Sequence, residues 1–231
     1  MKRALLGLMA ASIALSSALS PALARDRDPG RGYANPSAVI AAEIAFAKLA
    51  AEKGQWSAFR ATATKDAVMF EPHMVLAQEW LKTRIDPPKS VAWQPHQVWA
   101  SCDGSYAVTR GAWQREGSTG YFTTVWQRQK DGKYKWIMDQ GDALPFPMDP
   151  PEMIVAKVAD CPPGYRGKSP KPPKVPPAPF DPAMRAGKSD DGTLTWNVTV
   201  APDNARRFVV TMVSAGQPVI VQDLQVEAPA K

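Results

Sequence analysis

Residues with chemically useful side chains are few and widely spaced in this chain. Its two cysteines and two histidines lie far apart and show no zinc-type spacing, so we expect no metal site. The sequence contains no Gly-rich phosphate loop, nucleophile elbow, HExxH pair or dinucleotide fingerprint. Nucleophilic hydrolysis, phosphoryl transfer and metal-assisted chemistry are therefore not expected, and no cofactor is predicted. What remains are isolated carboxylates and histidines together with eight tryptophans.

The N-terminal residues have the order of a secretory signal peptide. Lys2 and Arg3 supply a basic start, residues 4–19 are apolar or small, and residues 22–24 have the small-x-small form of a cleavage site. Residues 1–24 are therefore predicted to be a signal peptide that is removed. No later segment approaches the ~20 apolar residues of a membrane span, so no integral span is expected after cleavage. We predict an exported protein and favour the periplasm, because no further sorting signal is visible.

The two cysteines support a prediction of their own. An exported chain meets an oxidising compartment, in which two thiols tend to pair. We therefore predict a disulfide between Cys102 and Cys161, which would tie the segment after Asp142 back onto the preceding domain. Two buried free thiols are the alternative.

The charge balance gives little reason to expect a nucleic-acid partner. The formal net charge is +6, and Lys2 and Arg3 would leave with the signal peptide. The remaining basic residues are scattered, and their densest group lies in a proline-rich stretch rather than on one face of a predicted element. We therefore expect no binding to nucleic acid.

Residues 35–84 show the pattern of helices with one short strand. Asn35 and Pro36 are typical of a helix start, and Gly54 is typical of a helix end. The intervening helix carries small and apolar residues at helical spacing, namely Ile40, Ile44, Ala47 and Ala51. The other expected elements are a short helix from residue 56 to about 62, a strand over residues 67–70 and a helix over residues 76–84.

Four strand-like runs follow, each separated from the next by a turn signal. The runs are residues 91–101, 105–114, 121–129 and 134–140. The turn signals are Asp103-Gly104, Glu116-Gly117 and Asp131-Gly132. Helices followed by a strongly curved antiparallel sheet form an α+β arrangement in which the helices cover one face of the sheet.

The composition changes after Asp142. Thirteen of the 23 prolines fall between Pro145 and Pro182, so residues 143–189 are predicted to be a Pro-rich linker with one short helix over residues 151–160. Residues 190–227 contain three alternating runs, which predict a small β-meander. Such a segment is too small to bury a core of its own, so we expect it to dock on the main domain or on a partner.

Residues 35–142 resemble the nuclear transport factor two-like superfamily, which includes ketosteroid isomerases, scytalone dehydratase and SnoaL-like polyketide cyclases. The resemblance rests on four segments, AEIAFAKLAAEKG, KDAVMFEP, AQEWL and GYFTTVWQRQKDGKYKWIMDQG. It implies a sheet wrapped around a cone-shaped pocket behind the N-terminal helices, and a homodimer through the outer sheet face as one arrangement. The chain after Asp142 lies outside the resemblance.

The resemblance also implies one catalytic position. In ketosteroid-isomerase-like members an acidic base sits just before a proline at the end of the first strand, and Glu71-Pro72 resembles that position. A carboxylate in an apolar pocket has a raised pKa, which suits proton abstraction near neutral pH, so Glu71 is the candidate general base. His73 would assist at the pocket mouth, since imidazole titrates near neutrality. A solvated loop position is the alternative for both residues, and His96 is expected to be an ordinary strand residue.

Asp139 is the other candidate to assist proton transfer. Strand alternation places it on the face opposite to Trp136 and Met138, so one of these two sets must point inward. A ligand contact and a turn cap are the two interpretations of Asp139.

The aromatic residues are the stronger indication of ligand class. Seven of the eight tryptophans lie in the region of resemblance, and several large rings together can line a cavity for a flat apolar ligand as well as form a core. The candidates for ligand binding are Trp80, Trp113, Tyr121, Trp126 and Trp136. Chain order alone does not say which face of the sheet is concave.

These observations support three functions. The leading hypothesis is an exported pocket protein that binds a small apolar or aromatic molecule, or an envelope protein, without efficient catalysis. The first alternative is a cofactor-independent isomerase, dehydratase or cyclase that uses Glu71 as its base. The second is an envelope assembly module that acts through its C-terminal strands.

Overall fold

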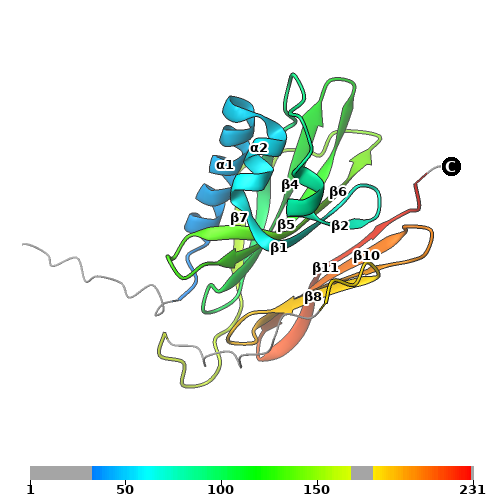
Figure 1. Ribbon diagram of the computed structural model, residues 1–231. Helices are drawn as coiled ribbons and strands as arrows, with labels where there is room; N and C mark the ends of the chain where they lie inside the picture. Colours follow the sequence, from blue (N-terminus) through cyan, green and yellow to red (C-terminus); the bar gives the residue numbers. More distant parts are fainter. Residues whose placement is uncertain (1–32, 168–178, 230–231) are drawn as a thin grey trace, which may run out of the picture.

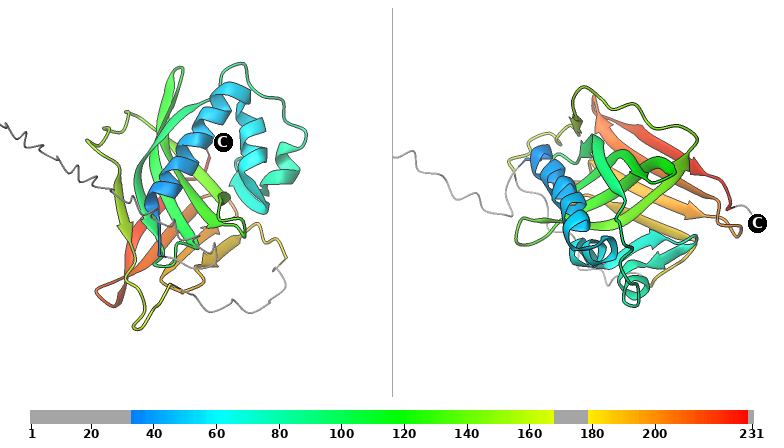
Figure 2. Two further views of the ribbon diagram at one scale, coloured as in Figure 1. Left: turned by 90° about the vertical axis from the view of Figure 1, so that its left-hand side faces the viewer. Right: turned by 90° about the horizontal axis from the view of Figure 1, so that it is seen from above.

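The computed structural model describes residues 33–167 and 179–229, so the predicted signal peptide and part of the Pro-rich segment lie outside the described residues. The described chain forms three layers (Figures 1 and 2). Two helices cover one face of a seven-stranded sheet, and a four-stranded sheet packs against its other face. The predicted α+β class with a large curved sheet is confirmed. Among the described residues, no helix combines the length and the apolar character that crossing a membrane requires.

The helices are α1 (Pro36–Lys53), α2 (Gln55–Thr62) and α3 (Ala77–Leu81). The side chain of Asn35 accepts a hydrogen bond from the Ala38 N–H at the start of α1 (3.4 Å). Gly54 ends α1 with a φ of 102°, a conformation that glycine adopts without a steric penalty. Helix α3 is shorter than the predicted span of residues 76–84, because residues 74–76 form strand β2 and turns follow Leu81.

The buried face of α1 differs from the apolar spacing noted in the sequence. Its buried residues are Val39, Glu43, Phe46 and Ala50, each one position before a residue of the predicted set. Ile44 of that set is 51% exposed. The difference arises because a carboxylate, Glu43, occupies the centre of the buried face, and an apolar pattern cannot reveal such a residue.

The large sheet has the strand order β2-β1-β6-β5-β4-β3-β7. Its strands are β1 (Ala63–Phe70), β2 (Met74–Leu76), β3 (Ala92–Ala100), β4 (Tyr106–Arg115), β5 (Ser118–Arg128), β6 (Tyr134–Leu144) and β7 (Val155–Val158). The pairs β1–β6 and β3–β7 are parallel, and the other pairs are antiparallel.

Strand β7 replaces the short helix that was predicted over residues 151–160. Its four residues pair in parallel with β3, from Gln97 opposite Val155 to Ala100 opposite Val158. So short a run has only a weak preference for helix or strand. Pairing with an available sheet edge decides its structure, because this pairing satisfies backbone hydrogen-bonding groups of both strands. The prediction of a helix was therefore wrong.

The small sheet has the order β11-β10-β9-β8 and is antiparallel throughout. Its strands are β8 (Met184–Lys188), β9 (Leu194–Val200), β10 (Arg206–Ser214) and β11 (Gln217–Val226). The last three correspond to the predicted meander, whereas β8 comes from the segment that was predicted as a linker. The sequence gives little sign of β8 because this edge strand is largely exposed and lacks strong apolar alternation.

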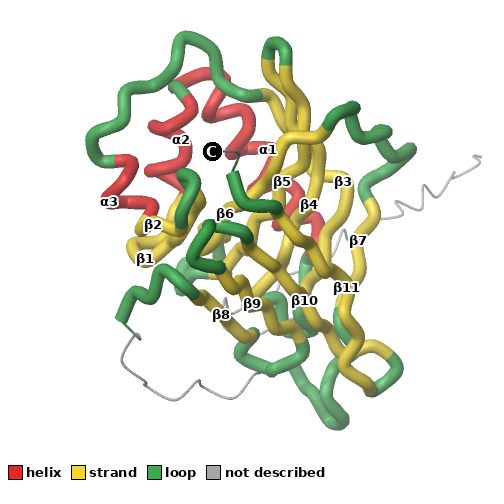
Figure 3. The backbone as a smooth tube through the Cα atoms, turned by 90° about the vertical axis from the view of Figure 1, so that its right-hand side faces the viewer, coloured by secondary structure: helices red, strands yellow, loops and turns green. Residues whose placement is uncertain are grey.

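Two apolar cores lie on the two faces of the large sheet. The first, between the helices and the inner face, includes Phe46, Trp126 and Trp136. The second, between the two sheets, joins Val108 and other residues of the large sheet to residues of the small one. The small sheet therefore docks on the main domain, one of the two predicted alternatives, and covers much of the outer face (Figure 3). A homodimer through that covered area would require the small sheet to move away.

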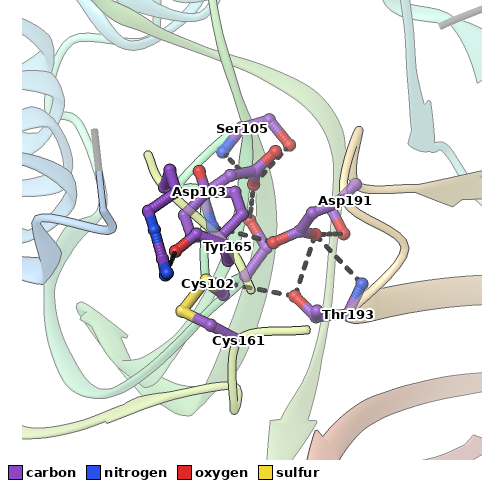
Figure 4. Close-up of a disulfide and its surroundings, with 10 residues drawn as sticks. Cys102, Asp103, Ser105, Cys161, Tyr165, Asp191 and Thr193 are labelled. Atoms are coloured by element: carbon purple, nitrogen blue, oxygen red, sulfur yellow. Dashed lines mark hydrogen bonds between the residues drawn. A yellow bond between two sulfur atoms is a disulfide. The ribbon is translucent and has the colours of Figure 1, made fainter. Parts of the chain in front are cut away.

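A disulfide and a hydrogen-bonded turn fasten the small sheet to the large one (Figure 4). Cys102 in the β3–β4 turn is bonded to Cys161, which follows β7, so the predicted pairing is confirmed. The Cys102 N–H donates to Thr193 Oγ1 (2.9 Å), and the Asp103 N–H donates to Asp191 Oδ2 (2.8 Å). The β8–β9 turn is thus held at the same place as the disulfide.

Replacement of both cysteines by alanine is expected to lower the free energy of unfolding by about 4 kcal/mol, because the unfolded chain then regains the entropy that the cross-link removes. Urea unfolding followed by circular dichroism measures this loss. Wild-type protein unfolded with a reductant is the matched control, and its midpoint should fall in the same way. Equal midpoints with and without reductant would show that the cross-link does not stabilise the fold.

Candidate functional site

A cavity of about 570 Å³ lies between the helices and the inner face of the large sheet. Seven aromatic side chains contribute to its lining, namely Phe46, Trp56, Phe59, Phe70, Trp93, Trp113 and Phe122. Three carboxylates, Glu71, Asp139 and Asp142, also line it, and the first two are half-buried. The site therefore combines an apolar wall with two half-buried carboxyl groups.

The aromatic wall is built by ring contacts between the helices and β3. Phe46 of α1 meets Phe59 of α2 and Trp93 of β3 edge to face, with both centroid distances at 4.8 Å. Trp56 meets Phe59 in the same manner at 5.6 Å. Edge-to-face packing of this kind fixes the rings relative to one another, so the wall has a defined shape.

Asp139 faces the cavity because β6 carries a bulge beside it. The register of β5 and β6 shifts by one residue, so Trp136 and Met138 pair with neighbouring residues of β5 and Ile137 is the extra residue. Ile137 and Met138 both lie in the core between the sheets, whereas Trp136 lies in the core on the helix side. The prediction that Asp139 and Trp136 point to opposite faces is therefore wrong, since the extra residue shifts the alternation.

The surroundings of Asp139 favour its protonated form. Burial, followed by the nearby charges of Glu43 and Glu71, raises the pKa of Asp139 to about 8. One hydrogen bond, donated by Thr124 Oγ1 to Asp139 Oδ2 (2.7 Å), opposes this rise. Asp139 is half-buried and lines the cavity, so near neutral pH it is a neutral acid beside the aromatic wall.

Glu71 lies where β1 turns into β2. Its backbone N–H donates to the His73 carbonyl (2.9 Å), and the Glu71-Pro72 peptide bond is cis. The side chain is half-buried, and burial raises its pKa while the positive charge of Arg84 opposes the rise. Glu71 thus reaches the cavity, as the resemblance implied for its position.

Glu43 is a further carboxylate beside the cavity, which sequence analysis missed. It is fully buried on α1 and accepts hydrogen bonds from Trp93 Nε1 (2.8 Å), Thr109 Oγ1 (2.6 Å) and Trp126 Nε1 (3.0 Å). Burial raises its pKa, and the three donors offset part of the rise. A signal was present in the sequence, since Glu43 stands four residues after Val39 and three before Phe46 on one helical face.

Neither histidine lines the cavity that contains Glu71 and Asp139. His73 is exposed and is not among the residues that line the cavity, so it does not assist Glu71 there. His96 lines a second cavity of about 360 Å³ beside Pro147 and Met148, and burial lowers its pKa. No sequence pattern indicates this second cavity, because part of its lining comes from the Pro-rich region.

Most of the aromatic residues predicted to bind a ligand have other places in the structure. Of the five, Trp113 lines the cavity. Trp126 and Trp136 are fully buried in the core, and Tyr121 points to the outer face. Trp80 packs on Trp56 and under Arg84. The causes differ, because Trp126 and Trp136 pack against the helices, whereas Tyr121 lies on the opposite face of the sheet.

Comparisons with known proteins complete the description. No protein-family model and no curated protein matches the chain. The fold is similar to a "putative ketosteroid isomerase" from Parabacteroides distasonis, with a TM-score of 0.37 and 17% identity over 44% of this chain and 85% of that one. A second "putative ketosteroid isomerase", from Kribbella flavida, has a TM-score of 0.34 and 13% identity over 50% and 84% of the two chains. An NTF-2 like protein of unknown function from Burkholderia xenovorans has a TM-score of 0.34 and 14% identity over 51% and 90%.

The raised pKa of Asp139 makes a prediction for stability. The folded chain holds this proton more tightly than the unfolded chain, so the contribution of Asp139 is full below about pH 4 and is lost as the pH rises to about 8. As the pH rises from 4 to 8, the free energy of unfolding of Asp139→Asn should therefore increase by at least about 1 kcal/mol relative to that of wild type. This amount corresponds to about one unit of pKa. Urea unfolding across this pH range measures the difference, and a constant difference would contradict the assignment.

Proposed function

We propose that the cavity binds a small, flat, largely apolar molecule that carries a hydrogen-bond acceptor. The observation that supports this most directly is the combination of seven aromatic rings with the half-buried Asp139 in one cavity. A protonated Asp139 donates a hydrogen bond, whereas an ionised carboxylate only accepts. The ligand therefore needs an apolar ring system for the wall and an oxygen for Asp139.

The dimensions of the cavity fit this class of ligand. Small-molecule sites occupy roughly 300 to 1,000 Å³ and place a few polar groups in a mainly apolar lining. The volume of about 570 Å³ falls within that range. Lys89 and Arg115 also line the cavity and are exposed, so a polar end of the ligand would meet positive charge there.

Export to an oxidising compartment forms part of the proposal. The signal-peptide pattern of residues 1–24 supports it, and so does the Cys102–Cys161 disulfide, since such bonds persist outside the cytosol. The periplasm is the compartment we favour, and the ligand would be a molecule of that space.

Binding is tested with 2-naphthol, a flat aromatic molecule with one hydroxyl group, by titration calorimetry on the mature protein. Trp56→Ala removes one ring of the cavity wall and should weaken binding about tenfold, a loss of ~1.4 kcal/mol. The matched control is Trp80→Ala, which removes a neighbouring half-buried tryptophan that does not line the cavity.

Equal affinities for wild type and Trp56→Ala would contradict binding at the aromatic wall. An equal loss in Trp56→Ala and Trp80→Ala would show that the effect comes from disturbed packing of the helices.

The second candidate function is proton transfer at carbon, and a specific observation favours it. Glu71 and Asp139 line the same cavity, and the charge of Glu71 contributes to the raised pKa of Asp139. Two carboxyl groups whose environments separate their pKa values can divide the roles of base and acid. Glu71 would remove a proton beside a carbonyl group, and neutral Asp139 would donate a hydrogen bond to the carbonyl oxygen.

This reaction is tested by deuterium exchange at the carbon next to the carbonyl of 2-tetralone, followed by NMR in deuterated water. We expect saturable exchange that Glu71→Gln lowers about 100-fold or more, within the usual range for loss of a general base. His73→Ala is the matched control and should leave the rate unchanged, because His73 is exposed outside the cavity. A rate that is the same in Glu71→Gln would end the catalytic interpretation and leave ligand binding.

Assembly through the C-terminal strands has less support than either pocket function. The inner face of the small sheet packs on the large sheet, so the edges β8 and β11 and the outer face are what it presents to a partner. Binding to an envelope protein through those edges stays a prediction.

A further inference from the structure

A row of three polar side chains crosses the outer face of the large sheet. Arg110 on β4 is paired with Thr123 on β5, which is paired in turn with Gln140 on β6. We call these three residues the inter-sheet polar row. Two positions away along the same strands, the outer face carries Val108, Val125 and Met138, which are part of the core between the sheets.

The row contains hydrogen-bonding groups that have no partner within the described chain. Arg110 Nε, Thr123 Oγ1 and Gln140 Nε2 are all buried and unpaired. The side chains of Thr123 and Gln140 are 0% and 3% exposed. Gln222 on β11 is a buried residue of the small sheet, and its side-chain Nε2 and Oε1 are also buried and unpaired within the described chain. Because an unpaired buried polar group costs about 1–3 kcal/mol, several at once indicate a missing partner.

A second guanidinium reaches the row from the small sheet. Arg206 on β10 donates from Nε to Gln140 Oε1 (3.2 Å) and from its terminal nitrogen to the Gly141 carbonyl (2.6 Å). Gln140 thus accepts from Arg206, which leaves its own Nε2–H groups as free donors. The two sheets are held together here by polar contacts rather than by apolar packing.

The positive charges at this place exceed the negative ones. Arg110 lies over the Tyr121 ring (5.1 Å) and Arg206 over the Phe70 ring (4.6 Å), and within the described residues neither arginine forms an ion pair. Both arginines and Asp142 act electrostatically on Tyr121, so they surround one phenol. Asp142 is exposed and supplies one carboxylate against two guanidinium groups, and burial lowers the pKa of both arginines.

We propose that Arg110 and Arg206, together with the Gln140 amide, bind a small oxyanion between the two sheets, either a carboxylate or a phosphate group. Guanidinium groups present paired N–H donors that match both anions, and a desolvated cation is stabilised by a bound counter-charge. The half-buried positions of Arg110 and Arg206 give the anion access from solvent. Arg110 and Arg206 lie on the outer face of the sheet and do not line the aromatic cavity, whereas Gln140 also lines that cavity.

The test is titration calorimetry of the mature wild-type protein with inorganic phosphate and, separately, with acetate, with sodium chloride used to hold the ionic strength constant. We expect saturable binding of one of the two anions, and the anion that binds identifies the preferred group. Arg110→Met and Arg206→Met should each weaken binding by about tenfold or more, because each removes a hydrogen bond to a charged group. Arg207→Met is the matched control, since Arg207 is the exposed neighbour of Arg206 and pairs with Asp223.

Wild-type protein that binds neither anion saturably would overturn the proposal and assign the unpaired donors to buried water. Unchanged affinity in both folded arginine variants, or an equal loss in Arg207→Met, would overturn it as well. Near-ultraviolet circular dichroism reports whether the variants keep the native packing. If they do not, the wild-type side-chain amide signal of Gln140 provides the decision, because it must shift saturably with the bound anion and must not shift with sodium chloride.

Discussion

The burial of Glu43 is the interaction on which the rest of the structure depends. Its carboxylate accepts hydrogen bonds from β3, β4 and β5 at once, through Trp93, Thr109 and Trp126. These three bonds fix the rotation and height of α1 over the inner face of the sheet. Phe46, three residues further along α1, is thereby placed where it meets Phe59 and Trp93 and forms part of the cavity wall. A carboxyl group in the core thus determines the shape of an apolar cavity.

The same buried carboxyl group influences the chemistry of the cavity. Thr109 donates to Glu43, and Thr124, whose carbonyl lies 3.4 Å from Thr109 Oγ1, donates to Asp139. Glu43 and Asp139 are therefore neighbours within one polar network surrounded by aromatic rings. Ionisation of both carboxyl groups in this buried environment would cost much free energy, so a proton remains on one of them at neutral pH. Because burial disfavours the ionised form of Asp139, the cavity retains a hydrogen-bond donor.

The outer face of the sheet is covered in a different way. The small sheet supplies apolar residues that cover Val108, Val125 and Met138 on β4, β5 and β6. Polar side chains of the two sheets meet at Gln140. The disulfide at Cys102 and the contacts of the β8–β9 turn hold the opposite end. An extension of the chain thus occupies a surface that would otherwise be exposed.

Local signals in the sequence predicted the local features of the fold. Asn35, Gly54 and the Asp131-Gly132 turn act on neighbouring residues, so the start and end of α1 and the β5–β6 hairpin were found. Apart from the disulfide, features that depend on distant partners were mostly missed. Strand β7 exists because β3 offers an edge, and the inward orientation of Asp139 depends on a bulge opposite β5. The candidate site was predicted in part for the same reason. The position of Glu71 follows from a strand end and a proline, which are local signals. Glu43 is recognisable as a site residue only when its three hydrogen-bond donors are in place.

The measurement that tests this account most directly is the pH titration of the Asp139 side-chain carboxyl carbon by NMR in the folded wild-type protein. We expect a transition near pH 8, far above the ordinary value for aspartate, because burial and the neighbouring carboxylates oppose ionisation. A transition near pH 4 would show an ionised Asp139 at neutral pH, and it would contradict a cavity that offers a hydrogen-bond donor to its ligand.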